Sequence, residues 1–295
     1  MNRIHALPNA ALEKRVPPGL ARGSLPRGWI SGLILSNDTT DATNDIGISA
    51  GACRSTFNLV DGVPSTLSQD QIDIEIPVAI IKQLDVSWAP ENYDPEGFSG
   101  GGRSGGRSGS SLANGTWHAF AIGGPGEQAD ILFHDSVTQS SIIAALPQGY
   151  TAARRIGSII RVVGAIDEFT QTGDYFRRKK GRLDMDTTSL SSAGATFTLG
   201  GVPSGVSVLA LFNVYLNHSS SSAFLYMTNP DDERDNPNNA GVPLSTLAVA
   251  SGGFASGQAQ VQTNSAAQIF VDSNTAFTVL RAVTLGWWDD RGRND

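Results

Sequence analysis

A glycine-rich segment carries the residue spacing of a serine nucleophile. Gly102, Ser104 and Gly106 satisfy the G-x-S-x-G pattern of hydrolases, whose serine lies on a strained strand-to-helix turn beside a histidine and an acid. In this chain the pattern lies within GGGRSGGRSGSS, a tract with few side chains to bury. Such a tract does not offset its backbone entropy, so we expect a surface loop over Ser99–Ser111 and no nucleophile elbow.

Carboxylates gather in one polar segment, Asn229–Asn239. A Ca²⁺ site of the EF-hand type needs a glycine at the sixth place of its loop, where Asn236 stands. We therefore favour a solvated turn, or a contact tip, because loops on a rigid scaffold often carry recognition residues. The candidate receptor contacts are Asp231, Asp235, Asn236 and Asn238.

The sequence argues against a metal site and against a disulfide bond. The four histidines, His5, His118, His134 and His218, show no metal-ligand spacing, and we expect His134 to be a hydrogen-bonded surface side chain. The single cysteine, Cys53, excludes an intrachain disulfide and a cysteine-built zinc site. We predict neither a metal nor a cofactor.

One dense basic run, Arg177–Arg182, could contact phosphates. The chain as a whole has a formal net charge of -7, which gives no general attraction to nucleic acid. No segment reaches the roughly 18 apolar residues of a membrane-spanning helix. We expect no nucleic-acid partner and no membrane insertion, and we interpret the run as a linker, a solvated hinge or subunit salt-bridge belt over residues 177–182.

The elements that must position these residues are mostly strands. Charged residues make up 17% of the chain against about 25% in ordinary soluble domains, and small polar residues are abundant. Prolines restrict the first 27 residues to extended geometry, so residues 1–27 are predicted to form an irregular attachment arm. Residues 28–176 then read as a β-rich domain with one short helix.

Within that domain, apolar runs alternate with turn residues. Gly28–Ser36 and Asp45–Ala52 predict a hairpin, and Gln71–Ile76 alternates with the period of a half-buried strand. Ile80, Ile81, Leu84 and Trp88 are spaced as on a helix, so Val78–Trp88 is the predicted helix. Further strands are predicted at Thr116–Ile122, Asp130–His134 and Arg155–Val163, followed by two short strands within Ala165–Phe176.

Residues 183–295 predict an antiparallel β-sandwich of the jelly-roll kind. Short strand candidates recur there at sandwich-like spacing, separated by turn residues. Trp287 and Trp288 point to opposite faces if the last strand continues through them, which predicts one core side chain and one exposed at an interface.

Five segments of the chain carry a resemblance: GLILSNDTTDATNDIGISAGACRS, ANGTWHAFAI, ADILFHDS, LPQGYTAARRIGSIIR and TLGWWDDRGR. They resemble segments of structural proteins of tailed-bacteriophage virions, of the tail fibre or head fibre type. The resemblance covers Gly28–Phe176, and Leu183–Asp295 only through its ending. It implies a homotrimeric virion appendage that docks on tail, collar or capsid proteins through its N-terminal arm, with Arg3, Leu7, Leu12, Arg15 and Leu20 as candidate docking residues.

Three functions follow as hypotheses. The first is a non-enzymatic virion structural protein, in which subunit packing about a symmetry axis buries the low-charge strand faces. The second is a receptor-binding or carbohydrate-binding tip module that contacts a host surface glycan. The third, ranked last, is a glycan-degrading enzyme, for which Asp167 with Glu168 or Asp231 with Asp235 are the nominal carboxylate pairs.

Overall fold

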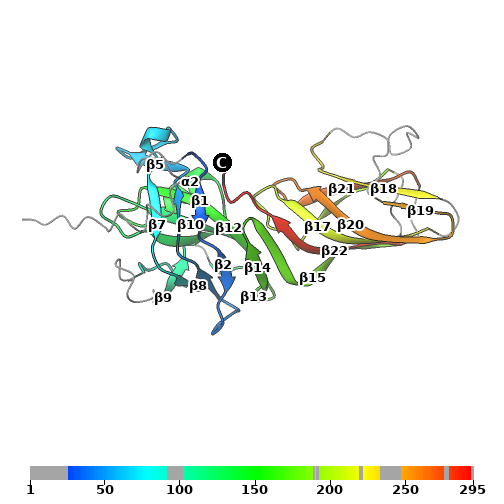
Figure 1. Cartoon of the computed structure of the whole chain (residues 1–295), viewed down its shortest axis with the longest axis horizontal. Coiled ribbons are helices and arrows are strands. Elements are labelled where there is room, and N and C mark those ends of the chain that lie inside the picture. The colour runs from blue at the N-terminus through cyan, green and yellow to red at the C-terminus, as the bar shows by residue number, and fades with distance from the viewer. Residues whose placement is uncertain are drawn as a thin grey trace, which may run out of the picture.

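The computed structural model has two lobes arranged along one long axis (Figure 1). It describes residues 26–91, 102–109, 111–188, 190, 193–218, 222–232, 247–275 and 279–293. Strands form most of both lobes, and the helices among the described residues are α2 (Gln139–Ala145) and one 3-10 turn (Ser68–Asp70). The predicted mainly β fold is confirmed. Residues 1–25, which contain nearly all of the predicted attachment arm, lie outside the described residues.

The N-terminal lobe contains a three-stranded sheet, β1-β4-β7, and a long mixed sheet. The long sheet has the order β2-β3-β8-β9-β11-β10-β12-β5-β6, with β13 beside β12. The strands are β1 (Ile30–Gly32), β2 (Leu35–Asn37), β3 (Asp45–Ile48), β4 (Gly51–Arg54), β5 (Phe57–Val60), β6 (Val63–Ser65), β7 (Asp73–Ile76), β8 (Ile80–Ser87), β9 (Arg103–Arg107), β10 (Gly115–Gly123), β11 (Asp130–His134), β12 (Ala152–Val162), β13 (Ala165–Ile166) and β14 (Phe169–Thr172).

The predicted N-terminal hairpin is present and bends into both sheets. β1 pairs with β4 in the small sheet, whereas β2 pairs with β3 in the long sheet, so each arm of the hairpin contributes two strands. The bend on the first arm falls at Leu33, which has a φ of 53° and is fully buried. A non-glycine residue in that region is uncommon, and its surroundings must hold it there.

The prediction of a helix over Val78–Trp88 is wrong, because this segment forms strand β8. Its buried positions alternate, with Ile80, Lys82 and Leu84 each no more than 1% exposed. Because the middle one of these three buried residues is a lysine, the alternation of apolar and polar residues that marks a strand is not visible in the sequence. The helix α2 lies instead at Gln139–Ala145, where Ile142 is its buried residue.

The prediction of a surface loop over Ser99–Ser111 is also wrong at its centre. Arg103–Arg107 forms β9, which runs parallel to β8 on one side and to β11 on the other. Gly105 and Gly106 are buried. A β-carbon on Gly105 would lie 1.9 Å from the carbonyl oxygen of Ser87, so the glycine permits a close backbone approach.

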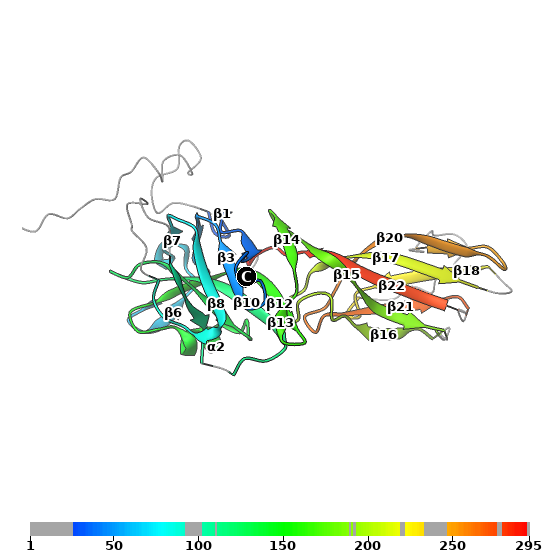
Figure 2. The same cartoon turned by 90° about the horizontal axis from the view of Figure 1, so that it is seen from below.

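The second lobe is an antiparallel sandwich of two four-stranded sheets, with orders β15-β22-β17-β20 and β16-β21-β18-β19. The described strands are β15 (Tyr175–Thr187), β16 (Ala195–Thr198), β17 (Leu209–Asn217), β18 (Ala223–Thr228), β19 (Leu247–Val249), β20 (Phe254–Gln262), β21 (Gln268–Ser273) and β22 (Val279–Trp288). Figure 2 shows β17 and β20 on one side of the lobe and β16 and β21 on the other. The first strand neighbours the last and the second neighbours the seventh, which is the strand order of a jelly roll.

The basic run at residues 177–182 is not a linker. It lies inside the long strand β15, which pairs with β14 at its start and with β22 along its length. Arg178 is buried and forms an ion pair with Asp167 at 2.7 Å, so part of the run is built into the junction. β14 in turn pairs with β2, and the long sheet therefore continues from one lobe into the other.

One hydrophobic core spans both lobes. Phe176 stacks on Trp287 with ring centroids 5.3 Å apart and packs against Phe169 at 5.7 Å, and all three are nearly fully buried. Buried residues on either side of this cluster are contiguous with it, from Leu33 in the first lobe to Val271 in the second. The two lobes therefore form one packed body.

Candidate functional site

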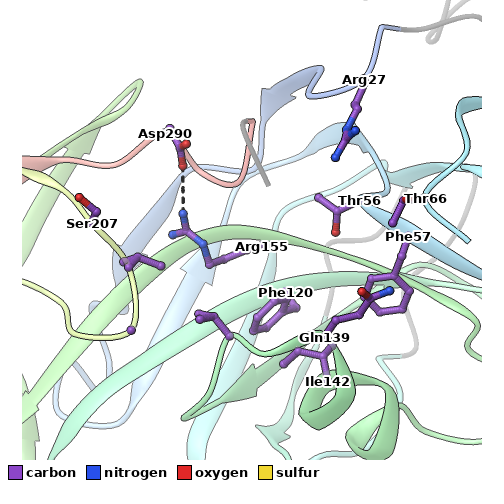
Figure 3. Close-up of a pocket in the computed structure, with 13 residues that line it drawn as sticks. Arg27, Thr56, Phe57, Thr66, Phe120, Gln139, Ile142, Arg155, Ser207 and Asp290 are labelled. Atoms are coloured by element: carbon purple, nitrogen blue, oxygen red, sulfur yellow. Dashed lines mark hydrogen bonds and ion pairs between the residues drawn. The ribbon is translucent and has the colours of Figure 1, made fainter. Parts of the chain in front are cut away.

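A cleft of about 490 Å³ opens where the two lobes meet (Figure 3). Its apolar wall comes from the N-terminal lobe, where Phe57 on β5, Phe120 on β10 and Ile142 on α2 belong to a second, smaller hydrophobic cluster. The loop that leads into β17 supplies residues 205–207 on the opposite side. The cleft therefore exists only because the lobes are held together.

Polar groups line the rest of the cleft. Gln139 presents an amide, which can donate and accept, and Arg27 lies at the rim on the N-terminal segment (Figure 3). The hydroxyls of Thr56 and Ser207 already donate to the carbonyls of Ala153 and Thr263, so toward a ligand they are acceptors. The arrangement suits a polar, uncharged ligand placed against an apolar wall.

A buried ion-pair network closes the cleft at Arg155, on β12. Its guanidinium lies 2.7 Å from a carboxylate oxygen of Asp289. It also lies 3.1 Å from a carboxylate oxygen of Asp290, and Figure 3 draws this second ion pair. Burial raises the pKa of Asp289, but the charge and hydrogen bonds of Arg155 outweigh it and hold that pKa below its usual value. The carboxylate therefore stays ionised and neutralises the guanidinium.

His118 lies behind this network and is nearly fully buried. Its Nδ1 is 2.9 Å from the Ser158 hydroxyl, which also accepts a hydrogen bond from Arg155 at 3.3 Å. Burial, together with the nearby Arg155 charge, lowers the pKa of His118 to about 3. The imidazole is therefore neutral at physiological pH, and its hydroxyl neighbour is fully buried, away from any substrate.

The C-terminal clasp, residues 289–293, fixes the geometry of the junction. Arg291 donates hydrogen bonds to the carbonyl oxygens of Ile156, Gly32 and Leu33, and it lies 2% exposed. Arg154, which is fully buried, donates to the carbonyl of Arg291 in return. Burial lowers the pKa of Arg291 to about 10, which still leaves it charged at neutral pH.

The structure describes little of the residues predicted to contact partners. Asp231 is exposed at a turn, where its N–H bonds the side chain of Asn229 at 3.0 Å. Asp235, Asn236 and Asn238 lie outside the described residues, as do the candidate docking residues Arg3, Leu7, Leu12, Arg15 and Leu20.

The nominal glycosidase pair Asp167 and Glu168 does not form a facing pair of free acids. Asp167 is bound to Arg178, and Glu168 forms an exposed ion pair with Lys179 at 2.8 Å. Their side chains therefore help hold β14 and β15 together at the junction. Ser104 of the G-x-S-x-G pattern lies on a strand and bonds Lys82 and Glu91, so the nucleophile-elbow geometry is not formed.

The structure also shows the positions of His134 and of the two tryptophans near the end of the chain. The Nδ1 of His134 accepts a hydrogen bond from the N–H of Ser136 at 2.9 Å, as predicted, but the side chain is 14% exposed and is therefore not at the surface as expected. Trp287 is buried, whereas Trp288 is partly exposed and stacks on Tyr175 at 4.4 Å. The two tryptophans thus lie on opposite faces of β22, as predicted.

The buried charges that organise the junction were not predicted from the sequence. Arg155 was assigned only to the strand Arg155–Val163, and Arg154 was given no role, although two adjacent arginines inside an apolar run must each find buried acceptors. The signal that could have identified them is the WDDR segment, which supplies Asp289, Asp290 and Arg291 near the end of the chain.

In comparisons with protein-family models, curated proteins and solved structures, nothing matches this chain. Within the described residues, no three histidine, cysteine, aspartate or glutamate side chains converge as a metal site would require. None of the described helices has the length and hydrophobicity needed to cross a bilayer.

Proposed function

We propose that this protein is a non-enzymatic structural protein of a tailed-bacteriophage virion, forming an oligomeric fibre that docks through its N-terminal arm. The sequence segments that resemble virion proteins support this, and so does the fold. Jelly rolls occur in viral capsid and lectin domains, which is an analogy of architecture. A continuous sheet and core join the two lobes, as an appendage that transmits force requires.

The proposal depends on exposed apolar side chains on the outer face of the sheet β15-β22-β17-β20, which we call the outer jelly-roll face. A shallow hollow of about 450 Å³ lies there, and its lining includes Leu183, Tyr215 and Val283 together with the polar Asn213, Gln258 and Arg281. Leu183 is 51% exposed, and Phe254, which stacks on Tyr215 at 6.2 Å, is 71% exposed. Exposed apolar side chains gathered on one sheet face mark an interaction surface, and we assign this one to copies of the same chain.

The test is the oligomeric state of the full chain by sedimentation equilibrium. We expect a trimer, and we expect Leu183→Asp combined with Phe254→Asp to shift it to a monomer that stays folded. Val63→Asp is the matched control, because Val63 is 65% exposed on β6 of the other lobe. A wild-type chain that sediments as a folded monomer at micromolar concentration would contradict the proposal.

The junction cleft supports a second candidate, a carbohydrate-binding module of such a fibre. The Gln139 amide offers a donor and an acceptor, and the Thr56 hydroxyl offers an acceptor, beside the apolar wall of Phe57 and Phe120, a combination that suits sugar rings and hydroxyls. Glycan-array binding by the full chain should be lost when Ser207→Trp fills the cleft. Binding that survives this change and is lost with Asp231→Ala would place the sugar at the predicted loop instead.

A further inference from the structure

Lys82 and Asp130 form a buried pair in the N-terminal lobe, far in sequence from the junction residues. The side chains are 0% and 1% exposed. The Nζ of Lys82 lies 2.9 Å from Oδ1 and 3.0 Å from Oδ2 of Asp130. The amine is therefore in contact with both oxygens of one carboxyl group.

The two residues belong to strands that are not neighbours. Lys82 lies on β8 and Asp130 on β11, and β9 runs between them. Lys82 is opposite Ser104 in the register, and a β-carbon on Gly106 would lie 3.0 Å from the β-carbon of Lys82. The small residues of β9 thus leave the space through which the lysine side chain crosses to Asp130.

A third acid is connected to the pair through a hydroxyl. The Nζ of Lys82 donates to the Ser104 hydroxyl at 2.7 Å, and that hydroxyl donates to Oε2 of Glu91 at 2.6 Å. Glu91 is itself 4% exposed. A proton on the amine therefore has a short hydrogen-bonded path to a buried carboxylate.

The surroundings disfavour charge on both reacting groups. Leu84 on β8 and Phe133 on β11 are fully buried apolar side chains on the same two strands. Burial lowers the pKa of Lys82, and the Asp130 charge opposes that shift only in part. Burial likewise raises the pKa of Asp130. Both shifts favour transfer of the proton from the ammonium to the carboxylate. That transfer gives an amine nucleophile beside a carboxylic acid electrophile.

We propose that the folded chain joins Lys82 to Asp130 by a covalent amide bond between Nζ and Cγ. The reaction converts one ammonium and one carboxylate into one amide and one water molecule, so it needs neither an oxidant nor a reductant. The crosslink joins β8 to β11 across the strand between them, β9. This inference is independent of the proposed virion function.

The contacts assign a role to each group. A proton moves from the ammonium to the Asp130 carboxylate, which leaves a neutral amine and a neutral acid in contact. Nζ then attacks Cγ, and the oxygens of the tetrahedral intermediate accept hydrogen bonds from the N–H groups of Ile131 at 2.6 Å and Glu91 at 3.1 Å. Nitrogen loses one proton through Ser104 to the Glu91 carboxylate, and Glu91 returns a proton to the hydroxyl that departs as water.

Intact-mass measurement of the denatured full chain tests the proposal. We expect the wild-type mass to be lower than the sequence mass by one water. Proteolytic digestion should release a branched peptide that joins the segments around Lys82 and Asp130, which distinguishes the crosslink from dehydration within a single peptide. A wild-type chain at full sequence mass, with both peptides linear after prolonged incubation, would overturn the proposal.

Two variants and one internal control complete the experiment. Asp130→Ala should restore the full mass for its sequence, and Glu91→Gln, which keeps the size of the side chain, should slow the loss of water in a mass time course. The pair Lys179 and Glu168 is equally close at 2.8 Å but exposed, so its peptides should stay linear. Crosslinking of Glu91→Gln at the wild-type rate would overturn the proton-relay role of Glu91.

Discussion

Lys82, Arg154 and Arg155 occupy inward positions on strands, and each is matched by oxygen atoms. Lys82 meets a carboxylate, a hydroxyl and the carbonyl of Ala89, while Arg154 bonds backbone carbonyls at 3.1–3.2 Å. For the two arginines, removing one partner leaves a charge buried without compensation, which costs far more than the loss of a surface ion pair. At the residue scale, the stability of the protein therefore depends on single buried partners such as Asp289.

Replacing Asp289 should be much more damaging than replacing its neighbour. Asp289 is 1% exposed beside Arg155, whereas the Asp290 side chain is 38% exposed. We expect Asp289→Ala to lower the free energy of unfolding by about 3–5 kcal/mol. Asp290→Ala should cost no more than about 1 kcal/mol. Urea denaturation of both variants gives the comparison, and equal losses would contradict the assigned roles.

Acid should destabilise the protein through His118. Its pKa falls from an ordinary value near 6.5 to about 3 on folding, so the unfolded chain binds one more proton between these two values. This contribution to stability is complete above pH 6.5 and is lost as the pH falls toward 3, at a slope of up to about 1.4 kcal/mol per pH unit.

The slope of the free energy of unfolding against pH, compared between variants, identifies the residue that takes up the proton. Denaturant titrations at several pH values should show a shallower dependence for His118→Asn than for the wild type. His134→Asn serves as the control, because His134 lies on the next strand and is more exposed. A slope unchanged in His118→Asn would show that another group takes up the proton.

At the scale of elements, the glycine strand β9 determines how its neighbours pack. Gly105 and Gly106 are buried where a β-carbon would meet Ser87 or Phe133, so their lack of side chains is a requirement of the sheet. The same composition predicted a loop, because a glycine tract gains little by burying its own side chains. The strand forms because β8 and β11 supply hydrogen bonds and apolar cover on both sides.

Adding one methyl group to this strand should therefore be costly. Gly105→Ala places a β-carbon 1.9 Å from a backbone oxygen, and we expect a loss of about 1–3 kcal/mol or more in the free energy of unfolding. Gly109→Ala is the matched control, because its β-carbon would meet nothing within 4 Å. Thermal denaturation of both variants checks the difference, and a Gly105→Ala chain as stable as the control would show that β9 can shift.

At the scale of the whole molecule, the C-terminal clasp makes two lobes behave as one. The chain leaves the jelly roll through β22 and returns to the first lobe, where Arg291 bonds three carbonyls (Figure 1). The paired strands β14 and β15, with Phe169 packed against Phe176, join the lobes a second time. The clasp joins residues more than 250 positions apart and one hydrophobic core spans both lobes, so the lobes are expected to unfold together.

Removing the clasp should uncouple the lobes. Arg291→Ala leaves the carbonyls of Gly32, Leu33 and Ile156 without their donor, at a cost of about 1–3 kcal/mol for each buried group. We expect the single calorimetric transition of the wild type to broaden or split into two. Arg293→Ala, at a side chain 36% exposed that pairs with Asp174, should keep one transition. A single sharp transition in Arg291→Ala would mean that the core alone couples the lobes.

The sequence by itself determined the strand content, the early hairpin, the jelly-roll character of residues 183–295 and the opposed faces of Trp287 and Trp288. These follow from alternation and turn residues, which are local properties of the chain. The tertiary structure alone decided that Val78–Trp88 is a strand with a buried lysine and that the basic run is built into β15. It also decided that Arg155 meets Asp289. A buried charge is stable only beside a partner distant in sequence, and local patterns carry no information about which partner that is.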